Sequence, residues 1–224
     1  MRQIFKSYGF IIFWLIAFID IIAAGFDADS IRMVTKPVLM PVLIFVVLSV
    51  GRPGKKRFLM IAGLFFSFLG DVFLLYEKSN TLFFVFGLFC FLLTHILYIW
   101  FFLSLSSGGT SLLAERPFLI LLVAAYSTSL IILLRPTLGV LFIPVVLYAL
   151  FLSAMLLSAI HVYKKVSLTS ARLFIGGALL FVASDSLLAV NKFYSPLPYA
   201  HFLIMASYCL AQYLIVKGFI KLQT

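Results

Sequence analysis

The chain is 224 residues long, 64% hydrophobic and only 11% charged, with a mean hydropathy of +1.21. A soluble domain has about 45–50% apolar and about 25% charged residues, so this composition excludes a soluble protein and leaves no room for a sizeable soluble domain. The net charge of +10 comes from basic residues in short segments beside apolar runs. This placement is typical of orientation signals and of contacts with anionic membrane lipid, and we expect no nucleic-acid partner.

Eight apolar stretches have about the length of 20 residues that a membrane-spanning helix needs. In chain order they are 8–25, 31–50, 58–76, 81–103, 117–134, 139–161, 169–190 and 199–221. Short connections with turn or charged residues separate them, and Arg135-Pro136 marks the break between the fifth and sixth. No small-residue cleavage site follows the first stretch, so we interpret it as a retained span. The predicted fold class is an all-α polytopic membrane helix bundle of about eight transmembrane helices, a single membrane domain over residues 1–224.

Basic residues are distributed unequally between the two sides of this predicted bundle. Twelve Lys and Arg residues fall on the side of the termini and five on the other side. Because basic residues accumulate in cytoplasmic loops, both termini are predicted to be cytoplasmic. We expect an integral protein of a bacterial inner membrane.

Two aspartates, Asp71 and Asp185, lie inside strongly apolar segments that resemble each other. Each follows a small residue, lies eight residues after a glycine and precedes a lysine by seven residues; these flanking residues are Gly63, Gly177, Lys78 and Lys192. A carboxylate in hydrocarbon is costly, so an intramembrane aspartate is by default a functional-site hypothesis. Two at matched positions predict a site with paired carboxylates.

The resemblance continues into the following spans, where residues 91–99 align with 208–216. We therefore predict two parallel four-helix repeats, 1–104 and 117–224, which would bring Asp71 and Asp185 to one depth facing one cavity. The alternative is chance similarity between helices rich in Leu and Phe.

Several other polar residues lie in these spans. Lys36 precedes Pro37: if its span begins near residue 31, Lys36 needs an anionic partner, and if it begins at Pro37, Lys36 is a loop cation. His95 and Tyr98 share one helix face, as do Tyr208 and Gln212, and roles near the carboxylates or ordinary interhelical hydrogen bonds are both open.

Polar residues near the ends of the spans receive different interpretations. Asp20 is interpreted as an interfacial residue near the end of the first span, and Lys78 as an interfacial cation. Lys192, with Asn191 beside it as a neutral donor and acceptor, fits either a lipid phosphate or an interfacial position. No spacing of His or Cys is typical of a metal site, and no phosphate-binding or nucleophile motif occurs, so neither a metal nor a cofactor is predicted.

These motifs resemble the lysoplasmalogenase (YhhN-like) family of multi-span membrane proteins. The matching stretches run from residue 36 to about 215: Lys36-Pro-Val-Leu-Met-Pro41, Gly70-Asp71, Thr94-His95-Ile-Leu-Tyr98, Ser184-Asp185-Ser-Leu-Leu-Ala-Val-Asn191-Lys192 and Tyr208-Cys-Leu-Ala-Gln212. The resemblance implies an enzyme that hydrolyses the vinyl ether bond of lysoplasmalogens. The implied products are a fatty aldehyde and glycerophosphoethanolamine or glycerophosphocholine.

The predicted residues suit this chemistry. Vinyl ether hydrolysis needs a proton on the β-carbon, and water then attacks the oxocarbenium ion. One protonated and one ionised aspartate supply both functions, so Asp71 and Asp185 are the predicted acid–base pair. The predicted substrate contacts are Lys36, His95, Tyr98, Ser184, Asn191, Lys192, Tyr208 and Gln212.

Two other functions share part of this pattern. Intramembrane Asp, Lys and His in parallel repeats also describe a proton- or cation-coupled transporter. A receptor or scaffold could use the same polar residues to join its helices. A transporter is expected to carry helix-breaking residues beside its ion site, and Asp71 and Asp185 follow Gly70 and Ser184 without a proline.

Overall fold

The computed structural model describes residues 2–50, 53–105 and 110–223, with side chains from residue 8 onward. Its described residues form helices, turns and coil and contain no strand, which confirms the all-α fold class. The chain divides into two compact units, one made of the residues up to Phe101 together with Gln223, and one covering Phe102–Leu222. Of the twelve basic residues counted on the side of the termini, Arg52 and the side chains of Arg2 and Lys6 lie outside the described residues.

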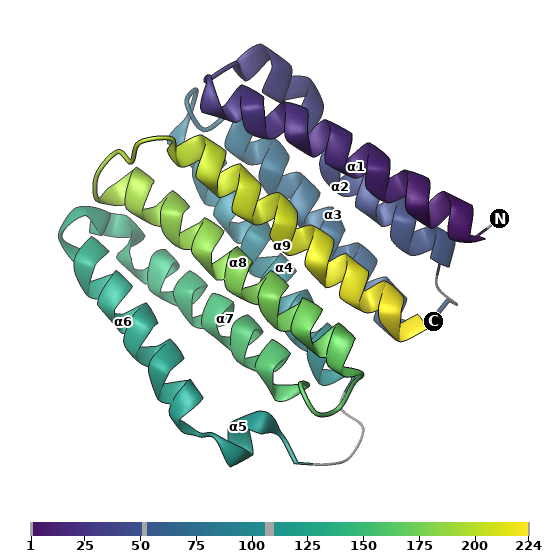
Figure 1. Cartoon of the computed structure of the whole chain (residues 1–224). Helices are drawn as coiled ribbons and strands as arrows, with labels where there is room; N and C mark the ends of the chain where they lie inside the picture. Colours follow the sequence, from purple (N-terminus) through teal and green to yellow (C-terminus); the bar gives the residue numbers. More distant parts are fainter. Residues whose placement is uncertain (1, 51–52, 106–109, 224) are drawn as a thin grey trace. The chain divides into compact units, whose positions relative to one another are not determined.

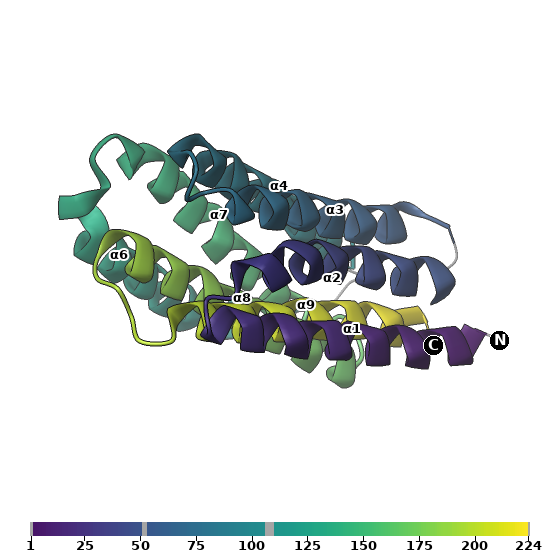
Figure 2. The same cartoon turned by 90° about the horizontal axis from the view of Figure 1, so that it is seen from above.

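The first unit contains four long helices: α1 (Arg2–Gly25), α2 (Asp29–Val50), α3 (Lys55–Leu75) and α4 (Thr81–Leu103). A turn of three residues joins α1 to α2, so these two helices pack side by side as a hairpin (Figures 1 and 2). Asp27 in this turn adopts a φ of 52°, a conformation that Asp tolerates better than most residues. The hairpin brings polar side chains of α1 against α2.

Helices α3 and α4 approach each other closely through small residues. A Cβ atom at Gly63 would overlap the ring of Tyr98, and one at Gly70 would come within 2.7 Å of Phe91. Between these contacts the hydroxyls of Ser67 and Thr94 are 3.1 Å apart, and both residues are buried. Small residues at such an interface allow the two helices to pack closely. This matters in a membrane, where the hydrophobic effect contributes little to helix association.

The second unit contains a short helix and four long ones: α5 (Leu112–Glu115), α6 (Phe118–Leu138), α7 (Phe142–His161), α8 (Leu168–Phe193) and α9 (Ala200–Gln223). The one-turn 3₁₀ helix η1 (Gly139–Leu141) joins α6 to α7. Helices α6, α7 and α8 pack against one another, as Figure 1 shows in green. The side chain of Ser167 caps α8 by accepting a hydrogen bond from the backbone N–H of Ser170, as expected for serine at this position.

The break between the fifth and sixth spans lies later than the sequence prediction. Arg135 and Pro136 were expected to end the fifth span, but both lie inside α6. The helix ends instead at Gly139, which adopts a φ of 49°. A proline in the last turn removes only one helical N–H, whereas a left-handed conformation ends the helix and suits glycine.

Seven continuous helical stretches in the described residues are long and apolar enough to cross a membrane. One of them, 118–161, is 44 residues long and contains α6, η1 and α7. Because α6 and α7 pack against each other as a hairpin, this stretch is two helices, which agrees with the eight predicted spans. The chain is therefore an integral membrane protein.

Candidate active site

Asp71 on α3 forms a buried ion pair with Lys36 on α2. The Lys36 Nζ and the Asp71 Oδ1 are 3.7 Å apart, and the two residues are 5% and 1% exposed. Helix α2 begins at Asp29, so Lys36 lies two turns inside the helix and is not a loop cation. A buried cation needs an anionic partner, and Asp71 supplies it.

Asp185 on α8 has a different partner in the second unit. The Tyr148 hydroxyl on α7 donates a 2.6 Å hydrogen bond to the Asp185 Oδ2. Asp185 is only partly buried, whereas Asp71 is fully buried. The second carboxylate is thus stabilised by a neutral donor and the first by a full positive charge.

The residues beside Asp185 fix α8 to its neighbours. The Ser184 hydroxyl donates to the Ile204 carbonyl on α9 at 3.0 Å. The Ser186 hydroxyl accepts from the Tyr126 hydroxyl on α6 at 2.8 Å. These contacts attach α8 to α9 and to α6 on either side of Asp185.

An apolar cavity of about 280 Å³ lies in the second unit among α6, α7 and α8. Its walls include Val182 and Ala183 on α8, which precede Asp185 by one turn or less. Ser127 and Ser153 line it as well, and their hydroxyls are paired with each other at 2.6 Å. The cavity therefore has a mainly apolar lining, and Asp185 is not one of its lining residues.

The remaining predicted residues divide between the two units. His95 and Tyr98 lie on α4 in the unit of Asp71, and both are fully buried. Tyr208 and Gln212 lie on α9 in the unit of Asp185 and are buried, with the Tyr208 ring edge-on to Phe181. That Asp71 and Asp185 face one cavity stays a prediction.

Asn191 and Lys192 end α8, and their environments differ. The Asn191 Oδ1 accepts a 2.9 Å hydrogen bond from the backbone N–H of Leu197, so Asn191 holds the connection to α9. Lys192 is exposed at the same helix end. The amide oxygen of Asn191 therefore has a structural role, and Lys192 is the more accessible of the two.

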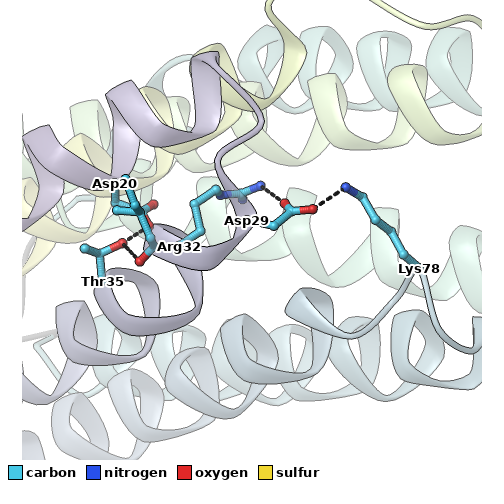
Figure 3. A network of polar contacts seen from close by, with 6 residues as sticks. Asp20, Asp29, Arg32, Thr35 and Lys78 are labelled. Carbon is cyan, nitrogen blue, oxygen red and sulfur yellow. Dashed lines mark hydrogen bonds and ion pairs between the residues drawn. The ribbon is translucent and has the colours of Figure 1, made fainter.

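Asp20 corrects the sequence interpretation. It was expected to be interfacial, but it is 0% exposed, and its Oδ1 accepts a 2.6 Å hydrogen bond from the Thr35 hydroxyl on α2 (Figure 3). At the end of the same hairpin, the Asp29 Oδ2 accepts a 2.7 Å hydrogen bond from Lys78, and its Oδ1 lies 3.9 Å from Arg32. Packing of α1 on α2 encloses Asp20, which a position near a span end does not reveal.

Tyr148 and Tyr126 were not identified from the sequence. An aromatic residue in an apolar span usually indicates packing. The one signal for a polar role was the general tendency of a buried tyrosine to form a hydrogen bond through its hydroxyl. As for metals, no cluster of three or more His, Cys, Asp or Glu side chains suited to bind an ion occurs in the part of the chain that the structure describes.

The model of the YhhN family matches residues 31–219. Human lysoplasmalogenase TMEM86A is 34% identical over 177 residues, or 75% of this chain and 67% of the relative. Human lysoplasmalogenase TMEM86B is 34% identical over 75% of this chain and 66% of the relative, and the rat TMEM86B is 29% identical over 83% and 71%. The chain thus spans about two thirds of these curated relatives, and no solved structure matches it significantly.

Proposed function

This chain belongs to the YhhN family, and from that membership we propose that it hydrolyses the vinyl ether bond of lysoplasmalogens. As a relative of curated lysoplasmalogenases, it is a membrane hydrolase with a lipid substrate. The proposed products are a fatty aldehyde and glycerophosphoethanolamine or glycerophosphocholine. The observation that carries the proposal is a pair of intramembrane aspartates with unlike partners, Lys36 for Asp71 and Tyr148 for Asp185.

The proposed reaction uses these two carboxyl groups in turn. The protonated aspartate of the pair donates its proton to the β-carbon of the vinyl ether, and the α-carbon becomes an oxocarbenium ion. The ionised aspartate removes a proton from water as the water oxygen bonds to this α-carbon. The hemiacetal hydroxyl then returns a proton to the aspartate that acted as acid, while the aspartate that took the proton from water gives it to the glycerol oxygen. The bond from carbon to the glycerol oxygen breaks, the aldehyde and the alcohol leave, and both aspartates regain their starting protonation states. Unequal environments are what allow two carboxyl groups to hold different protonation states.

The proposed substrate contacts follow from the positions of the polar residues. Lys192 is exposed at the end of α8 and suits the lipid phosphate, with Asn191 holding the adjoining turn. The apolar cavity among α6, α7 and α8 is proposed to hold part of the hydrocarbon chain, because its lining is mainly apolar. Further contacts are proposed for Lys36, His95, Tyr98, Ser184, Tyr208 and Gln212.

We also propose a bacterial inner-membrane location with both termini in the cytoplasm. The excess of basic residues on the side of the termini supports this orientation. Labelling single cysteines introduced at Asn80 and Thr224 with an impermeant maleimide on whole cells tests it. The proposal requires labelling at position 80 and protection at position 224.

The test of the function is incubation of the purified protein, in a lipid nanodisc, with a lysoplasmalogen and with its ester-linked lysophospholipid analogue. Mass spectrometry is expected to find fatty aldehyde from the first and no fatty acid from the second. Absence of aldehyde with the wild-type protein, across several head groups and chain lengths, contradicts the proposal. Uptake of an intact lipid or ion without product would indicate a transporter instead.

A further inference from the structure

The cavity among α6, α7 and α8 opens toward the hydrocarbon of the membrane. Two of its lining residues, Leu179 and Ala183, lie in the middle of α8, so the cavity is far from both ends of this span (Figure 1). Leu122 on α6 and Leu179 are 58% and 51% exposed, whereas Leu156 on α7 is buried. The two exposed leucines therefore line the mouth of the cavity, and Leu156 lines its inner wall.

Three hydroxyl groups line this cavity, and each uses its hydrogen atom within the protein. Ser153 donates to the carbonyl of Ala149 at 2.7 Å, so Ser127 is the donor in the 2.6 Å contact between the two serines. Tyr126 donates to Ser186 at 2.8 Å. Because the other lining residues are apolar, the cavity suits a hydrocarbon chain and offers no hydroxyl hydrogen to a phosphate, a carboxylate or a carbonyl group.

The volume of the cavity limits what it can hold. An apolar cavity of about 150 Å³ in another protein binds one benzene ring, so the volume of about 280 Å³ in this chain holds a segment of roughly ten carbon atoms. Small side chains create this space, because Ser127, Ser153 and Ala183 leave room that a leucine at the same position would fill. The cavity therefore accommodates part of one chain, and the rest of a longer chain stays in the bilayer.

One end of the cavity reaches the turn of α8 that carries Asp185, although Asp185 does not line it. Ala183 lines the cavity, and so does Tyr126, which is bound to Ser186, the residue after Asp185. Leu179 lies about 9 Å from Asp185 along the axis of α8, at about 1.5 Å per residue. The cavity thus extends along α8 away from this carboxylate.

We propose that this cavity binds the first part of the hydrocarbon chain of the single-chain substrate, which enters sideways from the bilayer, and that it selects chains by shape. The inference rests on the proposed function, because a vinyl ether at Asp185 brings the next carbons of its chain to this end of the cavity. The bilayer is as apolar as the cavity, so moving a chain from one to the other gains little free energy. Selection therefore comes from packing: a straight chain fits, and a chain with a bulky group in this part overfills the cavity.

The first test detects occupancy of the cavity without turnover. The probe is a lysophospholipid with a saturated alkyl ether, which lacks the reactive vinyl bond, and with a diazirine in the first half of its chain. After photolysis with the purified protein in a nanodisc, peptide mass spectrometry is expected to find label on Leu156 at the inner wall. An excess of the same lipid without diazirine is expected to remove this label, although the two-chain phospholipid of the nanodisc does not.

Variants of the lining separate filling of the cavity from loss of a hydrogen bond. Ser153→Leu fills the cavity and is expected to lose the competed label, and Ala183→Leu fills it from α8, so that the test does not depend on the folding of one variant. Ser153→Ala breaks the contact with Ser127 without filling the cavity and is expected to keep the label. Label that the competitor leaves unchanged, or label retained in both filling variants, overturns the inference. Competed label without aldehyde release refutes only the proposed function.

The second test measures selection by shape. Two lysoplasmalogens carry one phenyl group, either in the first half of the chain or at its end, and wild-type kcat/KM is expected to be about fivefold to a hundredfold lower for the first. Leu179→Ala widens the cavity and is expected to reduce this ratio, whereas Leu150→Ala, at an exposed position of α7 outside the cavity, is expected to leave it unchanged. Because each ratio is measured within one protein, partial unfolding lowers both rates alike. Equal rates for the two substrates in the wild type, or an unchanged ratio in Leu179→Ala, overturn the inference.

Discussion

The hairpin of α3 and α4 and the hairpin of α8 and α9 show how two similar sequences reach different electrostatic environments. In the first, Gly63 packs against Tyr98, and in the second, Gly177 packs against Ile215, the residue aligned with Tyr98. The aspartate follows the glycine by eight residues in both. The two carboxylates therefore lie on helix pairs with similar backbone packing. Their surroundings differ because other helices supply different partners.

The helices that supply these partners occupy equivalent positions in the two predicted repeats. Lys36 comes from the second predicted span and Tyr148 from the sixth, the second of the latter half. Equivalent spans thus supply the partner of each aspartate, which supports the predicted four-helix repeats. The partner is a buried cation in one case and a neutral hydroxyl in the other, and such asymmetry suits an acid and a base more than two redundant carboxylates.

The largest expected effect comes from removing either carboxyl group. Asp71→Asn and Asp185→Asn are each expected to lower kcat by about 10²–10⁴-fold, the usual contribution of a general acid or base. Asp185→Asn is expected to remain folded, because Asn keeps the shape and an acceptor for the Tyr148 hydroxyl. Asp71→Asn leaves Lys36 buried without its anion and is expected to lose about 3–5 kcal/mol of unfolding free energy, so its kcat is compared per folded molecule. Either variant keeping more than about a tenth of the wild-type rate would remove that residue from the acid–base pair.

Replacing Lys36 and Tyr148, the partners of the two aspartates, is expected to lower the unfolding free energy by different amounts. Lys36→Met leaves Asp71 buried without its cation and is expected to cost about 3–5 kcal/mol of unfolding free energy. Tyr148→Phe removes one hydrogen bond to the partly exposed Asp185 and is expected to cost about 1.5–3 kcal/mol, less than the loss of a buried ion pair. Denaturation in mixed detergent measures both, and equal costs would contradict the asymmetry. Part of the Lys36→Met loss is expected to return in Lys36→Met/Asp71→Asn.

Substitution of Gly63 and Gly177 tests whether the α3–α4 and α8–α9 hairpins pack in the same way. A Cβ at Gly177 meets the Ala211 carbonyl oxygen at 2.9 Å, which is backbone and cannot move aside. The nearest atoms to a Cβ at Gly63 belong to the Tyr98 ring, which is a side chain. Both Gly→Ala variants are expected to lose about 1–3 kcal/mol, with Gly177→Ala the larger. Tyr98→Leu should rescue Gly63→Ala, and unchanged melting temperatures in both variants would argue against close packing.

The smallest effect concerns Lys192, which is exposed at the end of α8. Because the lipid phosphate does not change during the reaction, a contact with it binds ground and transition states alike. Lys192→Ala is therefore expected to raise KM several-fold with kcat nearly unchanged. Lys78→Ala, whose lysine binds Asp29 in the other unit, is the matched control. A collapsed kcat with unchanged KM would place Lys192 beside the reacting atoms.

Much of the fold could be predicted from hydropathy, because each span must satisfy its own backbone hydrogen bonds in lipid. The placement of the fifth break was wrong because a proline near a helix end is tolerated, whereas Gly139 adopts a left-handed turn. Asp20 was misplaced because its burial depends on how α1 packs on α2. Tyr148 was missed because periodicity does not tell a packing tyrosine from one whose hydroxyl binds a carboxylate.

The central claim is that a carboxylic acid in the membrane protonates the vinyl ether on carbon and that water completes the hydrolysis. The most direct measurement is mass spectrometry of the fatty aldehyde formed in deuterium oxide and trapped at once by borohydride reduction. We expect one deuterium on the carbon next to the former carbonyl, and almost no product from Asp71→Asn or Asp185→Asn. Aldehyde without that deuterium, or labelled product formed at the wild-type rate by either variant, would contradict it.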